Sequence, residues 1–81
     1  MEKEIEKRYN INVKYDFGFF MNNCNITYIN RDGNEYLLQR NTSTFDECVD
    51  ISNTFKKDMS HGELLMSGFK YIPPKNNYIY F

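Results

Sequence analysis

The dipeptide Asp32-Gly33 constrains the fold of this chain most strongly, because it lies between two segments of high strand propensity. A two-residue Asp-Gly connection is typical of a β-hairpin with a type I′ turn. Glycine readily adopts the positive φ that this turn needs, and aspartate tolerates it better than most residues. The sequence therefore predicts a hairpin that turns at Asp32-Gly33, with strands at about 24–30 and 35–39.

A third strand is predicted before this hairpin. Apolar residues alternate with polar residues or glycine from position 11 to 19, which is the pattern of a strand with one buried face. The buried face would carry Ile11, Val13, Tyr15, Phe17 and Phe19. Three consecutive strands with short connections predict a three-stranded antiparallel meander.

The segment 44–59 has the pattern of an amphipathic helix that packs on this meander. Thr44 and Glu47 have the spacing of a capping box, and acidic residues precede basic ones, as suits the helix dipole. Apolar or small residues recur at helical spacing and form one stripe. That stripe consists of Phe45, Cys48, Val49, Ser52, Phe55 and Met59.

The two ends of the chain predict smaller elements. Residues 2–8 are expected to form a short polar N-terminal helix, and Ser60 can cap a second short helix through residues 64–66. Segments 69–72 and 78–81, separated by Pro73-Pro74, predict a C-terminal hairpin. The predicted fold class is thus α+β, in a single domain that spans residues 1–81.

Charge and composition restrict the classes of function. The net charge of the 81 residues is −1, and the lysines and arginines are scattered, which disfavours nucleic-acid binding. The charged start and the lack of a long apolar run predict no membrane association and a location in the host cytosol. Cys24 and Cys48 are then expected to be reduced.

Residues that could carry catalysis or bind a metal do not form a recognisable motif. His61 is the only histidine, and a Cys–His dyad or a zinc site with Cys24 and Cys48 lacks the usual spacing. We interpret both cysteines as small core residues and His61 as part of a polar helix start. The sequence therefore predicts no enzyme, no cofactor and no metal site.

Two features favour binding to a partner. The chain has more aromatic residues than a small domain buries easily, so some are either interface anchors or unusual core material. These are Phe17, Phe19, Phe20, Tyr71, Tyr78, Tyr80 and Phe81. In addition, carboxylates outnumber arginines between positions 31 and 50 and could share one acidic edge that faces a basic groove, or form an ordinary solvated face. They are Asp32, Glu35, Asp46, Glu47 and Asp50.

The hairpin sequence Asp32-Gly33-Asn34-Glu35-Tyr36, between the predicted N-terminal helix and the helix that follows, resembles a family of small phage-encoded anti-CRISPR inhibitors. Members of that family bind the type II effector nuclease and mimic the DNA motif that it reads. The resemblance covers about residues 2–59. It implies that Asp32, Asn34 and Glu35 contact the partner and that Gly33 holds the turn.

We therefore expect a non-enzymatic phage or mobile-element protein that inhibits a host defence nuclease by occluding its surface. Asp46, Glu47 and Asp50 would supply a supporting acidic face. One alternative is a small regulatory or nucleic-acid-binding domain, in which aromatic strands at 11–20 or 69–81 stack on bases beside Lys14, Lys70 and Lys75. Another is a homodimer joined through an edge strand at 78–81.

Overall fold

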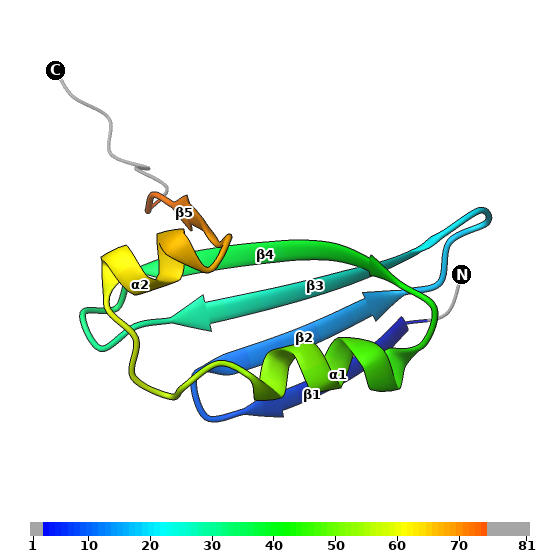
Figure 1. Ribbon diagram of the computed structural model, residues 1–81, viewed down its shortest axis with the longest axis horizontal. Helices are drawn as coiled ribbons and strands as arrows, with labels where there is room; N and C mark the ends of the chain where they lie inside the picture. Colours follow the sequence, from blue (N-terminus) through cyan, green and yellow to red (C-terminus); the bar gives the residue numbers. More distant parts are fainter. Residues whose placement is uncertain (1–2, 75–81) are drawn as a thin grey trace, which may run out of the picture.

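The computed structural model describes residues 3–74, which form a five-stranded antiparallel sheet with two short helices on one face (Figure 1). The strands lie side by side in chain order, so every strand pairs with its neighbour in sequence. They are β1 (Lys3–Arg8), β2 (Ile11–Asp16), β3 (Asn22–Ile29), β4 (Glu35–Thr42) and β5 (Lys70–Ile72). The helices are α1 (Phe45–Asn53) and α2 (His61–Met66), both between β4 and β5.

The prediction of a three-stranded meander packed by one main helix is therefore wrong, although the broad α+β class holds. Strands β2, β3 and β4 do form an antiparallel meander. The predicted N-terminal helix is instead strand β1, which pairs with β2 along its whole length. Five of its six residues are charged, and such side chains protect an edge strand from further pairing while its backbone bonds to β2.

Helix α1 starts where the sequence predicts but ends earlier. Thr44 is extended and its hydroxyl accepts a hydrogen bond from the Glu47 N–H at 3.2 Å, which confirms it as the N-cap. The helix ends at Asn53, because the residues after it turn back toward the end of β3. Met59, the last residue of the predicted stripe, is buried in the core from this connection rather than from the helix.

The core lies between the sheet and the two helices. Alternate residues of β2, β3 and β4 face the helices and are buried, as the period-two pattern predicts. The pattern is wrong for Phe19, which is exposed in the loop after β2 ends at Asp16. Tyrosine takes the place of aliphatic residues at three central positions. The buried apolar side chains are Ile11, Val13, Tyr15, Cys24, Ile26, Tyr28, Tyr36, Leu38, Cys48, Met59, Leu64 and Phe69.

Cys24 and Cys48 form a disulfide, so the expectation that both are reduced is wrong for this structure. Cys24 faces the helices from β3, and Cys48 faces the sheet from α1. Their Cα atoms are 5.6 Å apart, a separation that suits a disulfide. The bond therefore ties α1 to the middle of the sheet.

The C-terminal hairpin predicted from 69–72 and 78–81 can be followed only in its first strand. Residues 70–72 form β5, which pairs with Glu35, Tyr36 and Leu37 of β4. The predicted strand at 78–81 and the dimer proposed through it lie outside the described residues. No helix within residues 3–74 is both long enough and apolar enough to cross a membrane.

Candidate partner-binding site

The β3–β4 turn spans residues 30–34 and is longer than the predicted two-residue turn. The Gly33 N–H donates to the Asn30 carbonyl oxygen at 2.9 Å, and Gly33 has a φ of 83°. Asp32 does not have positive φ, so the turn is not of type I′. The hairpin and the role of Gly33 are as predicted, whereas the turn type and its length are corrected.

Asn30 explains this difference. Its side chain is buried, and its amide oxygen accepts hydrogen bonds from the backbone N–H groups of Asp32 at 3.1 Å and Asn34 at 3.0 Å. The backbone N–H of Asn30 donates to the Asn34 carbonyl oxygen at 3.0 Å. An asparagine that bonds to the backbone following it sets the turn locally. The backbone and side chain of Asn30 therefore hold the turn in one shape.

The predicted contact residues of this turn face outward. Asp32 lies at the tip and is exposed, and Asn34 is half-buried. Glu35 starts β4 and is exposed on the sheet face that the helices leave uncovered, since it alternates with buried Tyr36. The carboxylates of Asp32 and Glu35 are thus available to a partner.

The acidic residues of α1 do not join this set. Asp46, Glu47 and Asp50 are all exposed, but α1 follows the far end of β4. The eight residues of β4 separate the β3–β4 turn from the start of α1 by about 25 Å, and Figure 1 shows them at opposite ends of the molecule. The structure therefore forms two separate acidic clusters instead of one edge.

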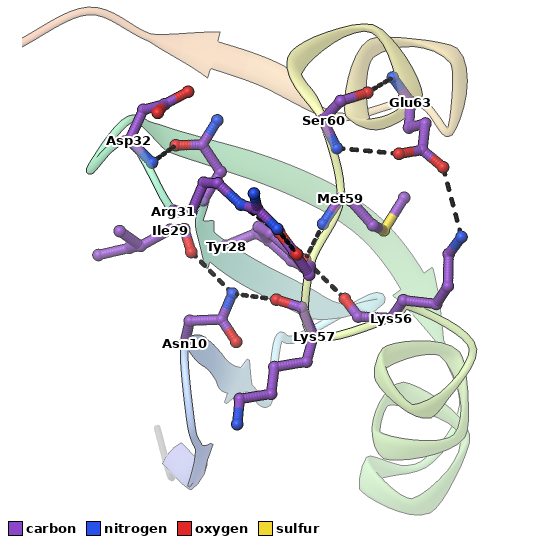
Figure 2. Close-up of polar contacts among 12 residues, drawn as sticks. Asn10, Tyr28, Ile29, Arg31, Asp32, Lys56, Lys57, Met59, Ser60 and Glu63 are labelled. Atoms are coloured by element: carbon purple, nitrogen blue, oxygen red, sulfur yellow. Dashed lines mark hydrogen bonds and ion pairs between the residues drawn. The ribbon is translucent and has the colours of Figure 1, made fainter.

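The connection between α1 and α2 contacts the β3–β4 turn and the adjacent β1–β2 turn (Figure 2). Arg31 forms an ion pair with Asp58, with its Nε atom 3.0 Å from Oδ1. The Asn10 amide nitrogen, from the β1–β2 turn, donates to the carbonyl oxygens of Ile29 at 2.7 Å and Lys57 at 2.8 Å. These contacts fasten three separate segments together at one end of the sheet.

A shallow hollow of about 680 Å³ lies beside the turn at this end. Tyr9 borders it with an exposed ring and a φ of 54°, and the Lys57 ammonium lies 4.4 Å from the centre of that ring. Its lining consists of Tyr9, Asn10, Ile29, Asn30, Arg31, Lys57 and Asp58. The sequence interpretation missed this hollow, because it placed a helix at 2–8 and so did not predict a turn at Tyr9-Asn10.

The second helix is fixed by a complete capping box next to the same connection. The Ser60 hydroxyl accepts from the Glu63 N–H at 3.2 Å, and the Ser60 N–H donates to the Glu63 carboxylate at 3.0 Å. The backbone and side chain of Ser60, followed by the nearby Lys56 ammonium, lower the pKa of Glu63 below its ordinary value. Glu63 is therefore an anion with a structural role.

The residues considered for catalysis are engaged in a disulfide or in contacts with tyrosine side chains. Both cysteine sulfurs are in the disulfide, which removes the Cys–His dyad and the zinc set built on them. His61 lies with its Nδ1 atom 2.7 Å from the Tyr36 hydroxyl and packs against the rings of Tyr36 and Tyr71. Across residues 3–74, no cluster of histidine, cysteine and carboxylate side chains is placed to hold a metal.

The nucleic-acid alternative requires aromatic side chains of 11–20 or 69–81 to lie beside lysines. Of these side chains, Tyr15 and Phe69 are buried, whereas Phe19 and Phe20 are exposed in the loop after β2. Tyr15, Tyr28 and Tyr36 are fully buried beneath the helices. Lys14 and Lys70 point to the opposite, uncovered face, where their neighbours across the strands are Ile5, Asn25 and Leu37. The lysines and the strand aromatics therefore lie on different sides of the sheet.

Comparisons with protein-family models, curated proteins and solved structures find no match to this chain.

Proposed function

We propose that this chain is a non-enzymatic protein that binds a partner protein through the β3–β4 turn and occludes a basic surface on it. One observation carries the proposal: the turn is fixed by buried Asn30 while the carboxylates of Asp32 and Glu35 stay exposed. A fixed loop loses little conformational entropy on binding. Exposed carboxylates give attraction and orientation toward a positively charged surface.

The partner that fits best is a host defence nuclease of the CRISPR type. This follows from the resemblance of the hairpin to phage-encoded inhibitors, in which turn carboxylates occupy the basic pocket that reads a DNA motif. Asp32 and Glu35 would make the charged contacts, and Asn34 would contribute its amide. Asp46, Glu47 and Asp50 would take part only in a contact that extends to the other end of β4.

A DNA-cleavage assay with a purified type II effector nuclease and its guide RNA tests this function. We expect the chain to inhibit cleavage, and the double variant Asp32→Lys/Glu35→Lys to inhibit at least tenfold more weakly, because attraction becomes repulsion. Glu4→Lys is the matched control, since Glu4 is an exposed carboxylate on β1, away from the turn. Inhibition unchanged by the double variant would exclude the turn, and no inhibition at large molar excess would exclude this nuclease.

The disulfide favours a second cellular setting for the same binding function, namely an oxidising compartment in place of the cytosol. Disulfides persist in oxidising compartments and are rare in the cytosol, where the nuclease would be met. Trapping of free thiols with N-ethylmaleimide, in bacteria that express the chain in the cytosol, separates the two settings. Two alkylated cysteines together with inhibition support the cytosolic setting. An intact disulfide that is required for binding supports an oxidising compartment.

A further inference from the structure

The loop between β2 and β3 exposes three large apolar side chains at the end of the molecule opposite the β3–β4 turn (Figure 1). Phe19 and Phe20 are 91% and 92% exposed, and Met21 is 59% exposed. Phe17, two positions before Phe19, packs against the core instead. We call Phe19, Phe20 and Met21 the aromatic loop.

The backbone around the aromatic loop is closely built. A Cβ atom on Gly18 would lie 1.9 Å from the carbonyl oxygen of Met21, so only glycine fits there. The Gly18 N–H donates to the Asn22 side-chain oxygen at 3.1 Å, and the Asn22 amide nitrogen donates to the Ser43 carbonyl oxygen at 3.2 Å. The loop is thus tied to the residues just before α1. The two phenylalanine rings contact each other edge to face, with centroids 4.9 Å apart.

Charged side chains border this apolar surface, and carboxylates outnumber basic groups among them. Lys3 and Asp16, which form an ion pair, line a hollow together with the aromatic loop. Glu47, in the first turn of α1, lines a small hollow together with Phe20 and Met21. Asp46 precedes it in the same turn and is also exposed. Aromatic anchors surrounded by charge are typical of protein-binding surfaces, where the charge selects a complementary partner.

We propose that the aromatic loop is a second contact surface, which inserts into an apolar pocket bordered by basic residues on a partner protein. The inference does not depend on the function proposed for the β3–β4 turn, because the two surfaces lie at opposite ends of the sheet.

The size and charge of the loop favour this occupant over two others. The three side chains offer on the order of 500 Å² of apolar surface, given 150–250 Å² for a buried aromatic residue. A contact of this size is small for any pair of proteins, so charge decides between partners: in a symmetric pair of loops, Glu47 and Asp46 of one copy would lie near those of the other, and like charges repel. Because Lys3 is paired with Asp16, the carboxylates of Glu47 and Asp46 leave a net negative charge near the loop, which opposes binding to an anionic membrane.

Selection of a random dodecapeptide phage library on the immobilised chain tests the proposal. We expect the selected peptides to combine apolar residues with lysine or arginine. A synthesised consensus peptide should lose at least tenfold in affinity with Phe20→Ser and about threefold with Glu47→Lys. Met66→Ser is the matched control, because Met66 is 91% exposed on α2, outside the loop, and should bind the peptide like the unchanged chain.

Phe20→Ser removes only an exposed ring, so an unchanged melting temperature will verify that this variant is folded. The proposal would be overturned by selected peptides that bind Phe20→Ser as tightly as the unchanged chain. It would also be overturned by peptides that lack basic residues and bind Glu47→Lys as tightly as the unchanged chain. Binding to phosphatidylglycerol vesicles that is lost with Phe20→Ser would assign the loop to a membrane instead. A dimer in light scattering that Phe20→Ser dissolves would assign it to a second copy. Either result overturns the proposed partner.

Discussion

The hydroxyl oxygen of Tyr28 accepts a hydrogen bond from the backbone N–H of Met59 at 2.8 Å. The same hydroxyl donates to the Lys56 carbonyl oxygen at 2.6 Å. Tyr28 is fully buried near the end of β3, and Figure 2 shows its hydroxyl reaching the connection between α1 and α2. One phenol group therefore satisfies two backbone groups of a segment that belongs to neither helix.

Replacement of Tyr28 by phenylalanine should destabilise the fold although it removes a single oxygen. The Met59 N–H and the Lys56 carbonyl would lose their partner, at a cost of about 2 kcal/mol for groups removed from water. For a domain of this size, that loss lowers the melting temperature by about 10 °C. Tyr9→Phe is the control, because the Tyr9 side chain is exposed. A melting temperature equal to that of the control would reject the bridging role of Tyr28.

Reduction of the disulfide should weaken the attachment of α1 to the sheet. Cys24 and Cys48 are separated by 24 positions, and closing a loop of that length stabilises the fold by about 3 kcal/mol in the chain-entropy treatment. We expect dithiothreitol to lower the melting temperature of the unchanged chain. The double variant Cys24→Ala/Cys48→Ala should melt at a lower temperature than the unchanged, disulfide-bonded chain, and dithiothreitol should not change that temperature. If mass spectrometry shows full reduction and the melting temperature does not change, the disulfide adds no stability.

The central part of the fold could be predicted from the sequence because local patterns and tertiary packing agree there. The alternation of Ile11, Val13 and Tyr15 identifies β2, and the Thr44–Glu47 spacing fixes the start of α1. The edges could not be predicted in this way. Residues 3–8 carry no strand pattern, and they are a strand because β2 offers them a backbone ladder.

The candidate site was predicted in part. The Asp-Gly sequence identifies the hairpin, but the influence of Asn30 on the turn depends on its burial, which the sequence does not state. The separation of Glu35 from Asp46 follows from the length of β4, and the sequence interpretation underestimated that length. The disulfide could not be predicted because the approach of Cys24 in β3 to Cys48 in α1 is set by how the helix packs on the sheet, which sequence spacing does not give.

Glu63 should make stability depend on acidity. Its pKa in the folded chain is below the ordinary glutamate value of 4.5, chiefly because the Ser60 backbone N–H donates to its carboxylate. A lowered pKa stabilises the fold above pH 4.5, and this stabilisation is lost as the pH falls through the folded value. Glu63→Gln retains the capping geometry and does not titrate. The difference in melting temperature between the two chains should therefore shrink as the solution is acidified below pH 4.5.

The control for this titration is Glu4→Gln, because the Glu4 carboxylate accepts no hydrogen bond within the part of the chain that the structure covers. The Glu4→Gln difference from the unchanged chain, measured over the same pH range, is the baseline for the Glu63→Gln difference. A Glu63→Gln difference that follows this baseline would show that the capping carboxylate is not stabilised in its charged form.

Two glycine-to-alanine changes should shift stability in opposite directions. Gly62 lies in α2 and a Cβ atom there meets nothing within 4 Å, so Gly62→Ala should stabilise the fold by about 0.5–1 kcal/mol through helix propensity. A Cβ atom at Gly18 would overlap the Met21 carbonyl oxygen, so Gly18→Ala must displace the aromatic loop. We expect it to destabilise the fold by about 1 kcal/mol or more, as for alanine at an incompatible site.

Denaturant unfolding measures both changes. The backbone amide resonance at position 18, compared between the unchanged chain and Gly18→Ala, reports whether the hydrogen bond to the Asn22 side chain survives. We expect that resonance to move toward the position of a solvent-exposed amide in the variant, because the displaced loop no longer holds the donor against Asn22. An unaltered unfolding midpoint for Gly18→Ala would show that the loop has room to rearrange, and that its outward-facing rings are not held in a fixed position.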